Sequence, residues 1–198
     1  MKNIITISRQ FGAGGSTIGK AVADRLGLYY CDKDMILKAA MESGSLSPEE
    51  VRYYDERVPR QFGFGQSLFD FYNKPLDERL FNAQKEAIRK VAEKGNCLIV
   101  GRNANIVLKE FDKTLHVFIA AEQRARLERM RGKMPGVSDE KILEHMKSVD
   151  KARAKYCKYY THTTFGDASY YDLSVKSSSL GIDACVDIIC KAAGEVRE

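Results

Sequence analysis

The chain has 198 residues, a formal net charge of +5 and an apolar fraction of 44%. This length suits one sizeable α/β domain, and the apolar fraction excludes a largely disordered chain. The mild positive charge suits anionic ligands such as nucleotides but does not by itself indicate nucleic acid. The sequence has neither a signal-peptide pattern nor an apolar run long enough to span a bilayer, so we expect a cytoplasmic protein.

A phosphate-binding loop is predicted near the N-terminus, where residues 4–20 read IITISRQFGAGGSTIGK. An apolar, β-branched run ends at Ile7, glycines follow, and a helical pattern begins near Ser16. This order lets backbone N–H groups surround an anion, and the helix dipole favours negative charge there. The alternative is a strand-to-helix turn that binds nothing. The residues expected to hold the donor phosphates are Gly12, Ala13, Gly14, Gly15, Ser16 and Thr17, with Ser16 or Thr17 as ligand of a magnesium ion.

The loop lacks the lysine that such loops usually carry. The Walker A pattern is GxxxxGK[ST], whereas residues 9–16 read RQFGAGGS. Arg9 therefore stands in place of the first glycine, and Gly15 in place of the lysine. The shape of the loop is retained but its main point charge is missing. We predict that another cation approaches the phosphates, with Arg9 as the first candidate.

The next elements supply a candidate carboxylate and an insertion. Asp32 follows the strand signal Leu28–Cys31; it either orients the acceptor or a metal-bound water, or caps the next helix. A helix start is predicted at Ser47–Glu50. Residues 58–73 carry five aromatic side chains among glycines, with no steady period. We expect an acceptor-binding insertion over residues 33–80, with the aromatic segment as a contact between copies of the chain.

Further strand signals alternate with helical patterns, as in a parallel sheet with crossover helices. Such sheets bind ligands at the carboxyl ends of their strands, which places Arg102 and Asn103 beside the loop. The cysteines form no CxxC pair and no metal-like group with histidines, and are expected to be free thiols. The predicted strands are Ile4–Ser8, Leu28–Cys31, Cys97–Val100, Leu115–Ala120 and Asp172–Val175.

Residues 121–160 are predicted to form a lid and the helix that follows it. Arg126 and Arg129 share one helix face, and Leu127 and Met130 lie on another. Planar, bidentate arginine contacts suit phosphoryl transfer, so we expect these two arginines to close over phosphates. The alternative is a solvated basic face. A break at residues 132–136, GKMPG, suits a hinge.

The helix after the hinge carries an arginine on its apolar stripe. Arg153 shares this stripe, whereas Lys151 points away from it. A buried arginine needs an anionic partner. That partner is either Asp150 alone, three residues earlier, or an acceptor phosphate as well. The stripe consists of Ile142, Met146, Val149, Arg153, Tyr156 and Tyr160.

Taken together, the segments ISRQFGAGG, GRNA and YYDLSVKSSSLGI resemble the cytidylate kinase-like family of P-loop nucleoside monophosphate kinases, and the resemblance covers nearly the whole chain. It implies a three-layer α/β P-loop kinase fold: a five-stranded parallel sheet flanked by helices, an insertion and an arginine-bearing lid. It also implies transfer of the ATP γ-phosphoryl group to a pyrimidine monophosphate such as CMP, with magnesium. The role of Arg102 in holding the acceptor phosphate carries over, whereas cytidylate kinases have aspartate where this chain has Asn103.

We therefore expect a single domain, residues 1–198, that acts as a nucleotide phosphotransferase with ATP and Mg²⁺. The main alternative is a nucleotide-binding regulator without turnover, because Gly15 replaces the lysine. A nucleic-acid module on the tyrosine- and lysine-rich helix is the third interpretation, without a supporting motif. The expected catalytic residues are Arg9, Arg126, Arg129 and Asp32, and the expected substrate-binding residues are Arg102, Asn103, Asp150 and Arg153.

Overall fold

The computed structural model describes residues 3–42 and 78–194. Within these ranges it shows the five-stranded, all-parallel sheet and the flanking helices that the sequence predicts. The predicted helix start at Ser47 and the aromatic segment 58–73 lie outside the described residues, as does most of the predicted insertion 33–80.

The strands follow the order β2-β3-β1-β4-β5 in the sheet. Each observed boundary lies within one residue of its predicted position. The central strands are apolar runs without alternation because helices cover both faces of the sheet. The strands are β1 Ile4–Arg9, β2 Tyr29–Cys31, β3 Cys97–Val100, β4 Thr114–Ala120 and β5 Leu173–Lys176.

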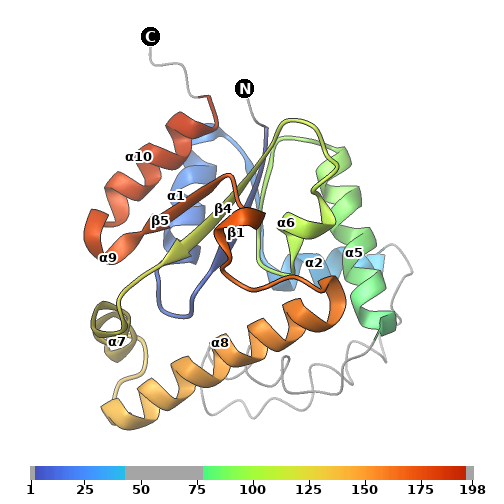
Figure 1. Ribbon diagram of the computed structural model, residues 1–198. Coiled ribbons are helices and arrows are strands. Elements are labelled where there is room, and N and C mark those ends of the chain that lie inside the picture. Colours follow the sequence, from blue (N-terminus) through green and yellow to red (C-terminus); the bar gives the residue numbers. More distant parts are fainter. Residues whose placement is uncertain (1–2, 43–77, 195–198) are drawn as a thin grey trace.

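Helices cover the sheet on both faces (Figure 1). One buried cluster joins α1 and α10 to the sheet, and a second joins α2, α5 and α6 to its other face. The helices are α1 Gly15–Leu26, α2 Lys33–Glu42, α5 Glu78–Glu93, α6 Ala104–Val107, α7 Gln123–Arg131, α8 Asp139–Thr161, α9 Ser177–Leu180 and α10 Ile182–Ala192, with a 3₁₀ turn at Ala168–Tyr170.

The long helix α8 lies across the end of the sheet toward which the strands point (Figure 1). Its apolar stripe is buried as predicted, from Ile142 to Tyr156, with Tyr160 partly buried. A third apolar cluster joins this stripe to Met130 on α7 and to Phe11 in the loop after β1. The glycine loop, α7 and α8 therefore meet at the carboxyl end of the sheet, where parallel sheets bind ligands.

All five cysteines are free and buried, as predicted. Burial raises the pKa of Cys31 to about 12 and that of Cys97 to about 11. Among the described residues, no group of three or more His, Cys, Asp or Glu side chains could hold a metal ion. No helix in the part of the chain that the structure describes is both long and apolar enough to cross a membrane.

Candidate functional site

The glycine loop connects the end of β1 to the first turn of α1. Gly12 and Gly14 adopt left-handed backbone conformations, with φ of 77° and 86°, which glycine reaches without steric cost. Gly14 precedes the 12-residue helix that begins at Gly15. The N–H groups of the first turn of α1 have no acceptor within the helix, so they lie together at its positive end. This is the strand, loop and helix order that the sequence predicts.

Hydrogen bonds from two other parts of the chain hold the loop in place. The Ser177 hydroxyl donates to the carbonyl oxygen of Ala13 at 2.7 Å. The backbone N–H of Ala121, after β4, donates to the side-chain oxygen of Gln10 at 3.0 Å. The conformation of the loop is thus fixed by β4 and α9 rather than by its own residues alone.

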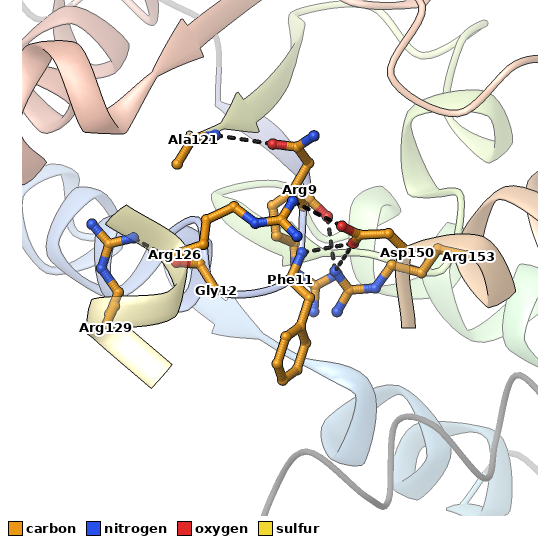
Figure 2. A network of polar contacts seen from close by, with 9 residues as sticks. Arg9, Phe11, Gly12, Ala121, Arg126, Arg129, Asp150 and Arg153 are labelled. Carbon is orange, nitrogen blue, oxygen red and sulfur yellow. Dashed lines mark hydrogen bonds and ion pairs between the residues drawn. The ribbon is translucent and has the colours of Figure 1, made fainter. Parts of the chain in front are cut away.

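Helix α7 packs directly on the loop. A methyl group on Gly12 would lie 3.2 Å from Met130 Cγ and 3.3 Å from Arg126 Cβ, so only glycine fits without displacement. Arg129 donates a hydrogen bond to the Gly12 carbonyl oxygen (Figure 2). The expected division of the α7 faces is wrong in one respect. Arg126 and Met130 are both buried and face the loop together, because they lie one helical turn apart.

Asp150 on α8 connects the loop to the arginines (Figure 2). Its Oδ2 accepts a hydrogen bond from Arg126 Nη1 at 2.9 Å, and its Oδ1 accepts one from the Phe11 backbone N–H at 2.8 Å. The Nη1 atom of Arg153 lies 3.8 Å from Oδ1, at the limit of an ion pair. The sequence suggested Arg153 as the partner of Asp150, whereas the nearer cation is Arg126, from another helix.

Arg153 is 4% exposed, as its place on the apolar stripe predicts, and Lys151 is exposed. The Nη1 atom of Arg153 donates to the carbonyl oxygen of Arg9 at 2.8 Å, and the Arg153 guanidinium lies 5.8 Å from the centre of the Phe11 ring. Its Nε is buried and has no acceptor among the described residues. A buried guanidinium whose nearest carboxylate is only at the limit of an ion pair has positive charge available for an anion.

A small pocket that is partly open to solvent lies beside the loop. It gathers the predicted residues Arg9, Arg102, Asn103 and Arg153 around one space, although β1, β3 and α8 supply them from distant parts of the chain. The lining, as far as the structure describes it, contains three arginines and no carboxylate, so its electrostatic character is positive. The full lining is Ser8, Arg9, Gly101, Arg102, Asn103, Arg153, Tyr156 and Phe165.

Sequence reasoning missed two aromatic walls of this pocket. Tyr156 was predicted to lie on the apolar stripe and in the tyrosine- and lysine-rich helix, but not in a pocket wall. Its hydroxyl donates to the side-chain oxygen of Gln84 at 3.0 Å. Phe165 lies in the segment between α8 and β5, where no periodic pattern marks its position. The helical phase shared by Arg153 and Tyr156 is the one signal that could have placed the tyrosine.

The turn after β3 presents Arg102 and Asn103. Both adopt left-handed backbone conformations, with φ of 58° and 53°, which are uncommon for residues with a side chain and concentrate at functional sites. Arg102 is 3% exposed, and the Asn103 Nδ2 atom is buried with no acceptor among the described residues.

Asp32 caps helix α2. Its Oδ1 accepts hydrogen bonds from the backbone N–H groups of Asp34 and Met35 at 3.1 and 3.3 Å, which is the capping alternative raised by the sequence. Asp32 also lies beside Tyr30, whose pKa is raised first by burial and then by the Asp32 charge. The Ser16 side chain is hydrogen-bonded to the same tyrosine. Ser16 and Asp32 therefore gather around one side chain, whereas Thr17 is exposed.

Comparisons with known proteins identify the family of the chain. A model of the cytidylate kinase-like family matches residues 4–179. The chain is 28% identical over 193 residues to a cytidylate kinase from Pyrococcus horikoshii, covering 97% of this chain and 88% of that protein. It is also 28% identical over 196 residues to a cytidylate kinase from Archaeoglobus fulgidus, covering 98% and 96%.

Solved structures share the fold. A protein of uncharacterized function from Eubacterium ventriosum superposes with a TM-score of 0.72 at 25% identity, covering 98% of this chain and 99% of that one. A shikimate kinase from Bacteroides thetaiotaomicron superposes with a TM-score of 0.55 at 14% identity, covering 96% and 97%. At this identity the second likeness concerns the fold alone.

Proposed function

The chain belongs to the cytidylate kinase-like family, and from this premise we propose that it transfers the γ-phosphoryl group of ATP to a nucleoside monophosphate such as CMP. The observation that carries the proposal is the arginine-lined pocket next to the glycine loop. Phosphoryl transfer needs donor and acceptor phosphates side by side, held by positive charge and by N–H groups. The loop and the pocket are adjacent sites of these two kinds.

On the donor side, the backbone N–H groups between Gly12 and Thr17 hold the β-phosphate. The left-handed glycines and the first turn of α1 supply the geometry for this. The Phe11 N–H does not take part, because it donates to Asp150. Arg129 already lies across the loop through its bond to the Gly12 carbonyl oxygen, so a small movement of α7 brings it to the phosphates.

On the acceptor side, Arg102 and Arg153 hold the phosphate of the nucleoside monophosphate. Both are almost fully buried and both line the pocket. The amide group of Asn103 lies beside them and contacts the rest of the acceptor. Asp150 acts one step removed from the acceptor in this proposal, because its two oxygens are bonded to Arg126 and to the loop.

A magnesium ion fits the oxygen atoms near the start of α1. Ser16 and Asp32, which gather around Tyr30, offer a hydroxyl and a carboxylate, and Mg²⁺ prefers such hard oxygen ligands, with the remaining positions filled by water and phosphate oxygens. Thr17 is the second hydroxyl of the loop. When bound, the ion neutralises phosphate charge. Asp32 would orient the ion through one carboxylate oxygen, while its other carboxylate oxygen caps α2.

A coupled ADP-release screen over nucleoside monophosphates with Mg-ATP tests the proposal. We expect turnover with at least one pyrimidine monophosphate. Shikimate and other small hydroxyl compounds belong in the same screen, because solved structures with this fold include shikimate kinases. Absence of turnover with every acceptor would contradict the proposal.

A nucleotide-binding regulator on the same scaffold is the second candidate. The observation in its favour is Gly15 at the lysine position. It predicts ATP binding, measured by calorimetry, without ADP release beyond the background of the assay. The screen and the calorimetric titration together separate the two functions.

A further inference from the structure

We propose that Arg9 and Gly15 are a reciprocal pair, in which Arg9 replaces the missing lysine and contacts both the donor and the acceptor phosphates. This inference rests on the proposed function for its ligands. Its steric half rests on packing alone and can be tested without any ligand.

The first observation is the close packing of the two residues. A methyl group on Gly15 would lie 2.6 Å from Arg9 Cγ, 2.8 Å from Arg9 Cβ and 3.3 Å from Arg9 Cδ. The nearest atoms belong to the part of the side chain next to the backbone, so rotation of the arginine cannot clear all of them. A side chain at position 15 therefore requires glycine at position 9, and an arginine at position 9 requires glycine at position 15.

The second observation concerns the sequence. Exchanging the two residue classes, by Arg9→Gly together with Gly15→Lys, turns RQFGAGGS into GQFGAGKS, which satisfies GxxxxGK[ST] at every fixed position. The Walker A pattern thus meets the same packing constraint, because only one of positions 9 and 15 carries a long side chain in either arrangement. The cation has moved from the helix to the strand, and the glycine has moved from the strand to the helix.

The third observation is the direction of the Arg9 side chain. From Gly15 it extends to Gly101, where a methyl group would lie 3.4 Å from Arg9 Cζ and in collision with Nη1. Gly101 and Arg102 line the acceptor pocket together with Arg9. The guanidinium therefore lies between the start of α1 and the pocket. A lysine on α1 would extend from the donor side, whereas this arginine reaches both sides.

Thermal melting tests the steric half. Gly15→Ala should lower the melting temperature of the wild-type protein by roughly 2–10 °C, because it overpacks a closed space. In the Arg9→Gly background the same change should cost nothing, because the obstructing atoms are gone. Gly132→Ala is the control, since the nearest atom to its added methyl would be 3.8 Å away. An equal loss in both backgrounds would overturn the pairing.

Calorimetric titration tests the ligand half. The probes are the magnesium complex of a non-hydrolysable ATP analogue and, separately, CMP. Arg9→Gly should weaken the binding of each by about tenfold or more, the range of a lost charged hydrogen bond. Adding Gly15→Lys should restore affinity for the ATP analogue but not for CMP. Arg25→Ala, which removes a surface partner of Asp187, is the control and should change neither affinity.

The outcomes separate the two proposals. If the double variant binds the ATP analogue as weakly as Arg9→Gly does, the exchange of cations is wrong. If Arg9→Gly leaves CMP affinity unchanged, the contact with the acceptor is wrong. If the wild-type protein binds neither probe, the proposed function and the ligand role of Arg9 both fail, while the melting experiment still decides the packing of Arg9 against Gly15.

Discussion

Arg126 and Arg153 lie on either side of the Asp150 carboxylate and differ in how closely this carboxylate pairs with their charges. They are similarly buried, at 7% and 4% exposed. Arg126 on α7 has a direct hydrogen-bonded ion pair with Asp150 at 2.9 Å. The Nη1 atom of Arg153 lies 3.8 Å from the same carboxylate and donates instead to the carbonyl oxygen of Arg9. The buried Nε atoms of both arginines have no acceptor among the described residues, so the two arginines differ in how their Nη1 atoms are paired.

Burial alone therefore does not distinguish a structural arginine from one that binds a ligand. An arginine with a close carboxylate has already paired its charge, and it holds α7 against α8. An arginine with only a distant carboxylate and a backbone carbonyl still has an unbalanced positive charge to offer to an anion. We therefore propose that Arg126 holds α7 against α8 and that Arg153 binds the acceptor phosphate.

Removing the shared carboxylate should have the largest effect. Asp150→Ala leaves Arg126 buried without its partner and removes the acceptor of the Phe11 N–H. Breaking a buried ion pair in this way costs about 3–5 kcal/mol in the free energy of unfolding. Urea denaturation measures it, with Glu144→Ala, an exposed acid on the same helix, as control. A loss no greater than that of the control would mean that Asp150 does not hold the two sides together.

Removing the Arg9 side chain should strongly reduce turnover but should change the stability of the fold only slightly. Arg9→Ala should reduce kcat by on the order of 10³-fold or more, as for other arginines that contact the transferred phosphoryl group. The melting temperature should remain almost unchanged, because the alanine retains the Cβ that packs on Gly15. Steady-state kinetics and melting on the same preparation measure both. A matching fall in stability and activity would make Arg9 structural.

Removing the Arg153 side chain should selectively weaken the binding of the acceptor. Arg153→Ala should raise the KM for the nucleoside monophosphate by roughly 10- to 100-fold, the value of a hydrogen bond to a charged group. Its stability cost should be smaller than that of Asp150→Ala, since Asp150 keeps Arg126 and the Phe11 N–H. Lys151→Ala, exposed on the same helix, is the control. A greater loss of activity with Lys151→Ala would show that the face assigned to α8 is wrong.

The exposed ion pair between Arg131 on α7 and Asp139 on α8 should have the smallest effect. A hydrogen bond from Arg131 holds the pKa of Asp139 below its usual value. Because the folded-state pKa is lower than that of the unfolded chain, the pair stabilises the fold above about pH 4, and this contribution disappears as the pH falls through the folded-state pKa. Wild type and Asp139→Asn should differ slightly in melting temperature at pH 7 and converge toward pH 2.

High salt should also remove this difference, because screening weakens exposed ion pairs far more than buried ones. A difference that persists in high salt or grows in acid would contradict the assignment of Asp139 to a weak surface pair. The same salt series applied to Asp150→Ala should leave its loss of stability largely intact, which sharpens the contrast between surface and buried carboxylates.

The sheet could be predicted from the sequence because its strands are covered on both faces. Runs such as Ile4–Ser8 and Cys97–Val100 are apolar throughout, and the glycine loop marks the first crossover unambiguously. The burial of Arg153 was also predictable, since a helix fixes the positions that share a face with Ile142 and Met146. These features depend on neighbours that are close in the sequence.

The partners within the site could not be predicted in the same way. The bond between Arg126 and Asp150 joins α7 to α8, and nothing in either segment specifies which arginine comes nearer to the carboxylate. The position of Phe165 in the pocket wall depends on how an irregular segment packs. The contact of Arg9 with Gly15 follows from the turn between β1 and α1, whose close approach is visible only in three dimensions.

The most direct test of this account compares Arg153→Gln with Arg126→Gln by calorimetric titration of the nucleoside monophosphate that gives the highest turnover. Melting curves first establish that both variants are folded at the titration temperature. Arg153→Gln should weaken binding about tenfold or more, whereas Arg126→Gln should stay within about twofold of wild type. Equal losses in the two variants, or a greater loss with Arg126→Gln, would contradict the claim that the carboxylate-paired arginine builds the lid and the other binds the acceptor.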